Sequence, residues 1–322
     1  MNKRQRKELV SLAGKDVRFG CPMARYTTFG IGGPVEALYE ARSRETLQQV
    51  IAYLNEEQID YLLVGRGSNL LVRDGSLEGV AILLRGSLAV IEEEKEDLPA
   101  PNEQTGNSSI FTGAGVSIAD LLNYCRASRL GGLEFLAGIP GTVGGAIVMN
   151  AGAFGKEIGP NVEEIHEITA QGALVVKDGS KLKFSYRTLE IEKGNLIIRA
   201  RLRSARETEE LIAERIANYL KKRKEIQPLE YPSAGSVFKN PPNDFAGRLI
   251  EKSGLKGERI GGAMISEKHA NYIVNTGGAR AKDVLALLCM ARETVKRETG
   301  IELEPEIRVV GHSNNEKTIR SK

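Results

Sequence analysis

The stretch GGLEFLAGIPGTVGGAIVMNAGAFG, residues 131–155, contains eight glycines in 25 residues and decides the fold class of this chain. Glycine lets the backbone turn sharply and lets backbone N–H groups approach a phosphate closely. Alternating strand patterns follow from about residue 162 to residue 203. Strands and helices alternate along the chain without a regular βαβ rhythm, which predicts an α+β fold and not a doubly wound sheet.

The composition is that of an ordinary folded protein with an excess of glycine. The 322 residues include 35 glycines, 41% hydrophobic residues and 27% charged residues, which is enough for a sizeable core and excludes global disorder. The 45 basic and 42 acidic residues give a net charge of +3, which argues against a dedicated nucleic-acid binder. No uncharged apolar stretch is long enough to span a membrane, and the basic start MNKRQRKELV lacks the apolar run of a secretory signal.

The cysteines indicate the compartment. Cys21, Cys125 and Cys289 are odd in number, lie far apart and form no CxxC pair. This pattern is typical of reduced thiols in a cytoplasmic protein. Only three histidines accompany them, so soft ligands are too few for a zinc site, and we expect no metal.

Local patterns before residue 90 predict a compact α/β unit. EALYEA alternates as a strand over Glu36–Ala41. The two apolar runs of YLLVGRGSNLLV, around a glycine turn, and then GVAILL complete the unit. Between them a helical pattern begins at the cap Ser43, and one face of that helix is apolar: Leu47, Val50, Ile51 and Leu54.

A switch from strand period to helical period near residue 206 marks the predicted domain boundary. The acidic, turn-rich run 91–109 is predicted to be an exposed excursion, because a strand pattern resumes directly after it. Helices are expected over 206–226, with Leu211, Ile212, Ile216 and Leu220 on one face, and over 244–253 and 281–299. The predicted division is an extension 1–24, a region 25–205 with subdomains of about 25–88 and 89–205, a C-terminal domain 206–312 and a tail 313–322.

Two glycine-containing blocks are candidates for holding a pyrophosphate. Neither has the GxxxxGK[ST] pattern or a GxGxxG that opens a helix after a strand, so P-loop and Rossmann binding are not supported. Tight turns in a crowded core explain the longer block as well when it is taken alone. The shorter block, with Ser and Asn as hydrogen-bonding residues, favours a joint cradle. The candidates are Gly65, Gly67, Ser68 and Asn69 in one block, and Gly138, Pro140, Gly141, Thr142, Gly144, Gly145, Asn150 and Gly152 in the other.

Two further strings contain residues that could act on a substrate. In AGSVFKNP, Ser236 lacks a GxSxG elbow and a nearby histidine base, so we expect a turn residue or a positioned proton donor and not a nucleophile. In FSYRTL, Tyr186 and Arg187 end a strand, where an arginine can hold a carboxylate bidentately. A surface ion pair explains the arginine better from that hexapeptide alone.

The C-terminal part adds acidic and polar candidates. In ELEPEIR, the residues Glu302, Glu304 and Glu306 are predicted to alternate along a strand and to face one side. Most such rows are solvated, but the neighbouring apolar strand allows one of them to be buried. In SEKHANYIVN, catalysis and satisfaction of the loop backbone explain His269 and Asn271 equally well.

Taken together, the chain resembles the UDP-N-acetylenolpyruvoylglucosamine reductase family, flavoenzymes of bacterial peptidoglycan precursor synthesis. The matching strings are TTFGIGGP, GRGSNLLV, GIPGTVGGAIVMNAGAFG, FSYRTL, AGSVFKNP, SEKHANYIVN and LEPEIR, in the family's order over nearly the whole chain. The resemblance implies a two-subdomain FAD-binding region of the vanillyl-alcohol oxidase (PCMH) type, followed by a smaller α+β substrate-binding domain. It also implies bound FAD, NADPH as reductant, and a cytoplasmic monomer that acts on an enolpyruvyl UDP-sugar.

The resemblance carries roles over to individual residues. Ser236 becomes the proton donor, and Arg187 and Glu306 surround the enolpyruvyl carboxylate of the substrate. The two glycine blocks, with Asn69 and Asn150, hold FAD. The residues implied to contact the substrate are Tyr186, Lys239, Asn240 and His269.

This chain departs from the family pattern at two places. Phe154 stands where GAYG is common, so a phenolic hydrogen bond near the flavin is missing. The segment from Arg187 to Ser236 is short, which resembles the subclass without an extra substrate-covering loop. Two alternatives stay open: another FAD-linked oxidase or dehydrogenase of the same superfamily, and a non-enzymatic relative that binds a flavin or a nucleotide sugar.

Overall fold

The computed structural model describes residues 1–92 and 107–312. Most of the predicted acidic excursion, residues 93–106, therefore lies outside the described residues. The chain divides into two compact units, and neither is continuous in sequence. The first contains Met1–Arg18, Leu38–Gly65 and Gly79–Arg223, and the second contains Phe19–Ala37, Arg66–Glu78 and the chain from Lys224 onward. The predicted ranges 25–205 and 206–312 stay a prediction about functional domains.

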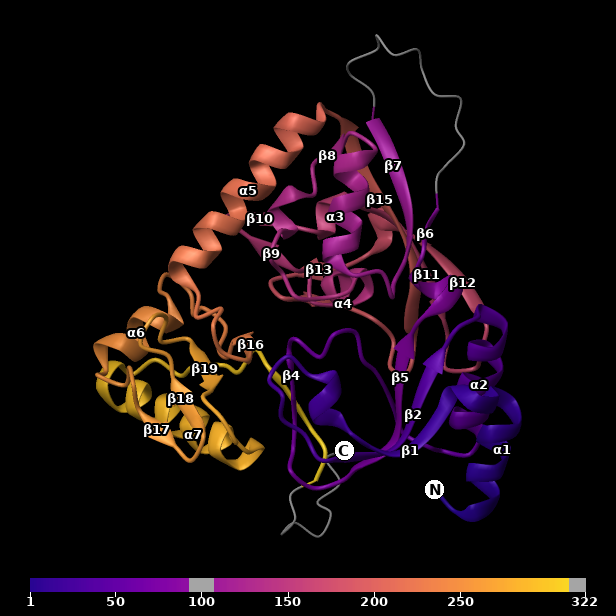
Figure 1. The fold of residues 1–322 in the computed structure, drawn as a ribbon, viewed down its shortest axis with the longest axis horizontal. Coiled ribbons are helices and arrows are strands. Elements are labelled where there is room, and N and C mark those ends of the chain that lie inside the picture. The colour runs from indigo at the N-terminus through magenta and orange to yellow at the C-terminus, as the bar shows by residue number, and fades with distance from the viewer. Residues whose placement is uncertain (93–106, 313–322) are drawn as a thin grey trace. The chain divides into compact units, whose positions relative to one another are not determined.

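A four-stranded sheet in the order β1-β2-β5-β3 contains the first strands of the chain. Helix α2 (Arg44–Glu56) begins where it was predicted, because the Ser43 hydroxyl accepts a hydrogen bond from Thr46 N–H at 3.3 Å. Its predicted apolar face is completely buried. Helix α1 (Lys3–Ala13) packs beside α2 (Figure 1). The strands are β1 (Val17–Pro22), β2 (Pro34–Ala41), β3 (Tyr61–Leu63) and β5 (Leu77–Leu84).

A larger antiparallel sheet of six strands belongs to the first unit (Figure 1). Five strands follow the order β12-β11-β15-β7-β6, and the sixth, β8, also pairs with β15. The alternating patterns after the glycine-rich stretch form strands as predicted. The strands are β6 (Ile91–Glu92), β7 (Asn107–Gly113), β8 (Leu130–Gly131), β11 (Val162–Ile168), β12 (Leu174–Asp178) and β15 (Leu196–Arg206).

Short elements between these strands carry the glycine-rich stretch and the FSYRTL string. Two helices enclose the start of the stretch, and two small hairpins follow. These elements are α3 (Ile118–Ala127), α4 (Val143–Val148), the hairpin of β9 (Gly152–Ala153) and β10 (Lys156–Glu157), and the hairpin of β13 (Phe184–Ser185) and β14 (Thr188–Leu189).

The second unit is built on an antiparallel sheet in the order β16-β19-β18-β17. Helix α7 (Ala281–Thr299) has the predicted bounds. Its first N–H groups, on Ala281 and Lys282, donate to the Asp74 carboxylate at 2.8 and 3.0 Å. The remaining elements are α6 (Ala246–Lys252), β16 (Ser233–Ser236), β17 (Arg259–Ile260), β18 (Ala263–Ile265) and β19 (Tyr272–Asn275).

Strand β4 (Leu70–Val72) corrects the predicted α/β unit. It does not join the sheet of β3 and β5 but pairs in parallel with β20 (Arg308–Val310) near the C-terminus. Leu71 is completely buried in the core of the second unit, together with Phe29 and Ile31. The apolar run was assigned correctly as a strand, but its partner is distant in sequence and leaves no local signal.

The predicted strand of alternating glutamates is also wrong. Glu302 and Glu304 are exposed outside any strand, and Glu306 is half-buried. Pro305 has no N–H to donate, and it forms only an isolated bridge with Phe238 before β20 begins.

Helix α5 (Glu209–Ile226) forms over the predicted range, but its packing differs from the prediction. Ile212 is completely buried, whereas Leu220 is 45% exposed. Two arginines of the helix are engaged by the protein. Arg215 Nη1 donates to Glu207 Oε1 at 3.1 Å, and Arg223 is buried. None of the helices within residues 1–92 and 107–312 is long and apolar enough to cross a membrane.

Candidate functional site

In the first unit the two predicted glycine blocks meet at Gly65 and Thr142. A Cβ atom added at Gly65 would lie 2.6 Å from Thr142 Oγ1, so the two segments approach each other as only glycine permits. Thr142 also caps α4 by accepting a hydrogen bond from Gly145 N–H at 3.3 Å. At Gly144 an added Cβ would lie 2.8 Å from Ala114 Cβ. Gly65 and Gly144 therefore allow close packing of the protein's own segments, which brings the two blocks together.

Burial separates the predicted cofactor residues of the longer block into two groups. Thr142 and Gly144 are buried and pack the chain, whereas Gly138, Pro140 and Gly145 are exposed. Gly141 N–H donates to Ile139 O at 3.0 Å, and its carbonyl accepts from Ile118 N–H at 3.0 Å. The exposed residues are therefore the better candidates for direct contact with a cofactor.

Asn150 ties the glycine-rich stretch to its neighbours. Its side chain is 1% exposed. The carboxamide Nδ2 donates to Glu157 Oε2 at 2.8 Å and to Ser185 O at 3.0 Å, and Oδ1 accepts from Gly159 N–H at 3.1 Å. These bonds fix the β13–β14 hairpin against the stretch, and a direct contact of Asn150 with FAD stays a prediction.

Arg187 lies at the turn of the β13–β14 hairpin. Its φ is 60°, a left-handed conformation that favours glycine or asparagine over an arginine. Its Nη1 donates to Gly152 O at 3.1 Å, and its Cζ lies 5.5 Å from the ring centre of the exposed Tyr186. A strained turn residue with a long cationic side chain suggests that the side chain has a function. The structure brings Arg187 to Gly152, and Asn150 bonds the same hairpin through Ser185 O.

The ring of Phe154 packs against helix α5. Its φ is 55°, and its ring centre lies 5.0 Å from that of Tyr219. Lys222 Nζ and Arg223 Cζ each lie 5.6 Å from the ring centre. Contacts of cations with an aromatic face therefore hold the loop after Gly152, where GAYG would present a hydroxyl.

In the second unit, Ser236 ends β16 and is followed by two core residues. Gly235 before it has a φ of 75°. Ser236 pairs with Tyr272 of β19, and the register shifts between Ser233 and Ser236. Val237 and Phe238 are each 1% exposed. Ser236 itself is half-buried, so its hydroxyl lies at the edge of a tightly packed segment.

Glu306 and Asn69 lie next to this segment. Glu306 N–H donates to Val237 O at 2.9 Å, and Asn69 Nδ2 donates to Glu306 O at 3.0 Å. Arg308 N–H donates to Asn69 O at 3.0 Å. The backbone thus joins two of the three predicted catalytic residues, Ser236 and Glu306, to the predicted cofactor residue Asn69 within the second unit.

Gly67 and Ser68 belong to the same unit as Asn69. Gly67 is buried with a φ of 61°, and a Cβ there would lie 2.2 Å from Tyr26 O. Ser68 and Asn69 are half-buried. Gly67 is therefore required for packing, and Ser68 and Asn69 are the residues of the shorter block with accessible polar groups.

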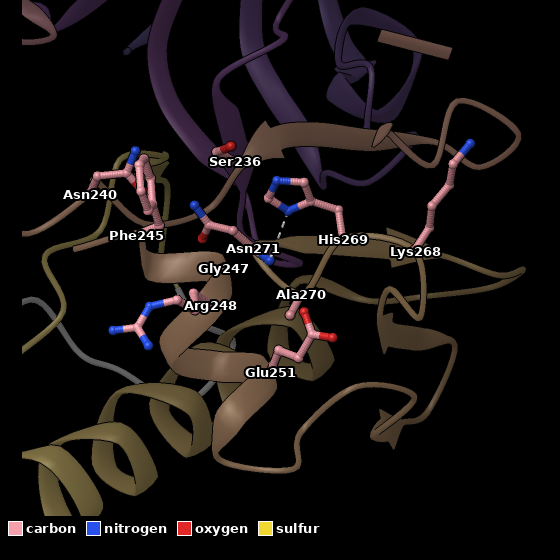
Figure 2. Close-up of a pocket in the computed structure, with 10 residues that line it drawn as sticks. All are labelled: Ser236, Asn240, Phe245, Gly247, Arg248, Glu251, Lys268, His269, Ala270 and Asn271. Atoms are coloured by element: carbon pink, nitrogen blue, oxygen red, sulfur yellow. Dashed lines mark hydrogen bonds between the residues drawn. The ribbon is translucent and has the colours of Figure 1, made fainter. Parts of the chain in front are cut away.

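A pocket of about 340 Å³ opens beside Ser236 (Figure 2). Of the predicted residues it contains Ser236, Asn240 and His269. Asn271, the other candidate of the SEKHANYIVN string, also lines it, and the lining residues that were not predicted include Phe245, Arg248 and Lys268. Phe245 is 67% exposed, and an aromatic residue in the first turn of the predicted helix 244–253 was the available signal.

His269 is held in one tautomer within this pocket. Its Nδ1 accepts a hydrogen bond from Asn271 N–H at 3.2 Å, so the neutral ring carries its proton on Nε2. Burial lowers the pKa of His269 below its ordinary value, although a backbone hydrogen bond partly opposes this. A Cβ at Gly247 would lie 3.0 Å from His269 Cε1, so glycine makes room for the ring. The pocket therefore contains a neutral N–H donor.

Lys239 and Asn240 are partly engaged by the protein. Lys239 Nζ forms an ion pair with Glu304 Oε1 at 2.6 Å. Asn240 Oδ1 accepts from Ala246 N–H, the first residue of α6, at 3.1 Å. Their contacts with a substrate stay predictions, as does that of Tyr186.

Two family profiles match this chain. Residues 227–310 match the UDP-N-acetylenolpyruvoylglucosamine reductase, C-terminal domain, and residues 34–177 match an FAD binding domain. The crystal structure of p-cresol methylhydroxylase covers 92% of this chain and 88% of its own at a TM-score of 0.50 and 10% identity, which shows the fold alone. The predicted fold, an FAD-binding region of the vanillyl-alcohol oxidase type followed by a substrate-binding domain, is confirmed.

Relatives agree over nearly the full length. The UDP-N-acetylenolpyruvoylglucosamine reductase of Caldanaerobacter subterraneus subsp. tengcongensis is 42% identical over 90% of this chain and 92% of its own. That of Geobacter metallireducens is 43% identical over the same shares. The crystal structure of UDP-N-acetylenolpyruvylglucosamine reductase from Thermus caldophilus has a TM-score of 0.77 at 37% identity, covering 90% of this chain and 98% of that one. This chain therefore belongs to the UDP-N-acetylenolpyruvoylglucosamine reductase family of FAD-containing oxidoreductases.

Proposed function

We propose that Ser236, Arg187 and Glu306 carry the reaction of this chain, the NADPH-dependent reduction of UDP-N-acetylglucosamine enolpyruvate to UDP-N-acetylmuramate in peptidoglycan precursor synthesis. The observation that supports it best is the backbone bond from Glu306 N–H to Val237 O, at 2.9 Å, which joins Glu306 to the residue after Ser236. FAD, when bound, supplies the hydride that NADPH provides.

The reaction adds a hydride to one carbon of an enol ether and a proton to its neighbour. An electron-rich alkene resists hydride, so negative charge must be drawn toward the attached carboxylate as the hydride arrives. Arg187 is the proposed cation at that carboxylate, since fixed positive charge stabilises a transition state in which negative charge develops.

Ser236 is proposed to protonate the second carbon. A serine hydroxyl is a weak acid, but the carbanion or enolate left after hydride addition is a strong base, so the transfer is feasible. A positioned acid typically contributes a factor of about 10² to 10⁴ in rate. The half-buried hydroxyl at the edge of the 340 Å³ pocket is accessible to a substrate.

Glu306 is proposed to donate a hydrogen bond to the same carboxylate in its protonated form. A carboxyl group stays protonated when burial raises its pKa. Its half-buried position is compatible with that role. The variant Glu306→Gln keeps a neutral donor and should retain far more activity than Glu306→Ala. Equal loss in the two variants would exclude neutral donation.

The proposed contacts with FAD come from the glycine blocks. In the first unit these are the exposed Gly138, Pro140 and Gly145, with Gly65, Gly141 and Gly152 beside them. In the second unit they are Ser68 and Asn69. The close approach of Gly65 to Thr142 supports this assignment.

The partners of this family are small molecules. We expect a cytoplasmic monomer that uses NADPH and the enolpyruvyl UDP-sugar, without nucleic acid and without membrane insertion. Sedimentation of the FAD-loaded protein tests the monomer: one species with the mass of one chain is expected, and a stable dimer would contradict it.

The visible spectrum of the anaerobic, FAD-loaded protein tests the function. We expect the flavin bands to bleach with NADPH and to return only when the enolpyruvyl UDP-sugar is added. Bands that stay bleached with that substrate but return with another oxidant would favour another FAD-linked oxidase or dehydrogenase. Flavin bands that never bleach would favour a non-enzymatic binding protein.

A further inference from the structure

The side chain of Asn271 forms hydrogen bonds with the backbone just after Ser236. Asn271 precedes β19 and is 3% exposed. Its Oδ1 accepts from Phe238 N–H at 3.0 Å, and its Nδ2 donates to Phe238 O at 2.8 Å. Its own carbonyl accepts from Val237 N–H at 2.9 Å. One asparagine therefore makes three hydrogen bonds to the two residues after the proposed proton donor.

The opposite edge of the same segment is also bonded. Glu306 N–H donates to Val237 O, and Lys239 N–H donates to Glu304 O, both at 2.9 Å. The backbone N–H and C=O groups of Val237 and Phe238, four in all, thus each have a hydrogen-bond partner within the second unit. Because both residues are buried, any of these groups left without a partner would be costly.

An interrupted strand pairing explains why a side chain is needed here. β16 ends at Ser236, which pairs with Tyr272, the first residue of β19, so the regular ladder stops before Val237 and Phe238. Backbone groups that are buried beyond the end of a ladder need other hydrogen-bond partners. The carboxamide of Asn271, with a donor and an acceptor on one plane, replaces the missing peptide of the ladder.

We propose that Asn271 is a positioning residue for the proton transfer by Ser236. This inference rests on the proposed role of Ser236. A proton donor must lie within about 2.6–3.2 Å of its acceptor, so a small shift of its backbone lowers the transfer rate steeply. Asn271 sets that backbone by fixing the next two peptide groups, and its side chain need not touch the substrate.

The variants Asn271→Ala and Asn271→Asp in the FAD-loaded full chain test the proposal. We expect reduction by NADPH to stay within twofold and the half-reaction with the enolpyruvyl UDP-sugar to slow by about 10- to 100-fold, the loss that a 1 Å misplacement produces. A larger solvent deuterium effect on that half-reaction is also expected, because proton transfer becomes limiting.

The aspartate variant adds a second readout. It keeps the acceptor for Phe238 N–H and loses the donor to Phe238 O, unless the carboxyl group is protonated. Burial favours the protonated form, so its second half-reaction should recover as the pH falls, relative to the wild type. His269, which accepts from Asn271 N–H, titrates in both proteins, and the wild-type profile is therefore the reference.

Asn275→Ala is the matched control. The Asn275 carboxamide also forms hydrogen bonds with the backbone. Its Nδ2 donates to Phe29 O at 3.0 Å, and its Oδ1 accepts from Gly277 N–H at 3.0 Å and from Ala279 N–H at 3.2 Å. It makes none of the bonds to Val237 or Phe238. We expect it to lower the thermal unfolding midpoint as Asn271→Ala does, with both half-reactions within twofold of the wild type. Equal slowing of the second half-reaction in the two variants would overturn the proposal.

The double variant Ser236→Ala with Asn271→Ala separates this inference from the proposed function. If Asn271 acts through Ser236, the double variant is no slower than Ser236→Ala. Multiplying losses would contradict the inference while leaving Ser236 as the donor. If Ser236→Ala fails to slow the second half-reaction, the proposed role of Ser236 is wrong. Should Asn271→Ala not fold with FAD, Asn271→Asp decides by the same two half-reactions.

Discussion

Two of the three proposed catalytic groups of this chain, Arg187 and Ser236, are held in opposite ways. Arg187 lies at the tip of a short hairpin in a left-handed conformation, with a bond from its guanidinium to Gly152 O at 3.1 Å. Ser236 precedes two buried residues whose peptide groups are bonded on both edges. One group sits on a small surface hairpin, and the other is joined to a protein core.

The difference matches the distance dependence of the two tasks. The attraction between a guanidinium and a carboxylate falls only as the inverse of their separation, so a cation works from an approximate position. Proton transfer needs a hydrogen bond of a defined length. A proton donor therefore benefits from the rigid core segment, whereas a cation tolerates the hairpin.

The largest expected effect is that of Ser236→Ala. The second half-reaction should slow by at least about 100-fold, since the positioned acid is lost, while reduction by NADPH stays unchanged. Stopped-flow absorbance of the flavin measures the two halves separately. Equal slowing of both halves would mean that Ser236 supports binding or folding and not proton transfer.

The next effect is that of Arg187→Asn. Asparagine tolerates a φ of 60°, so the hairpin should be kept while the cation is lost. We expect kcat/KM for the enolpyruvyl UDP-sugar to fall about 10- to 100-fold, since a hydrogen bond to a charged group contributes about 1.5–3 kcal/mol. Arg187→Lys keeps the charge and should lose less. An unchanged kcat/KM in Arg187→Asn would mean that Arg187 does not act on the substrate carboxylate, and its placement could then not be compared with that of Ser236.

Local signals in the sequence predicted the helices well. α2 and α7 have a cap or a glycine end and an apolar face within their own residues, so their positions could be inferred from short windows. β4 could not be placed, because its partner β20 lies at the other end of the chain. Pairing between distant strands depends on tertiary packing, which a local pattern does not contain.

The site was predicted unevenly for the same reason. Ser236, Asn240 and His269 were found through the family strings and do line one pocket. Asn271 stood beside His269 in the same string, but its two bonds to Phe238 join segments that are distant in sequence, which periodicity cannot show. Phe154 was recognised as a departure, whereas its contacts with α5 needed the structure.

A smaller effect is expected from Gly235→Ala, immediately before Ser236. Gly235 has a φ of 75° and open space around its Cα, so the variant should lose about 1–2 kcal/mol of unfolding free energy through backbone strain alone. Gly254 has a φ of 74° and equally open space, and Gly254→Ala is the matched control. Urea denaturation should give similar losses, while only Gly235→Ala slows the second half-reaction. Slowing in both variants would show that general destabilisation, and not the rigidity of the Ser236 segment, limits that step.

The smallest effect concerns the pH dependence of stability through His269. Burial holds its pKa below that of the unfolded chain, so the unfolded state binds the extra proton more readily. The stabilising contribution is therefore complete above the unfolded pKa of about 6.5 and is lost as the pH falls toward the folded pKa, with a slope of at most about 1.4 kcal/mol per pH unit. Protonation also removes the Nδ1 acceptor of Asn271 N–H, which weakens the hydrogen-bonded frame that Asn271 forms with Val237 and Phe238 beside Ser236. Urea denaturation between pH 5 and pH 7 should show a smaller pH dependence in His269→Gln than in the wild type. Identical slopes would mean that His269 does not titrate differently in the folded chain and that the frame of Ser236 is independent of its charge.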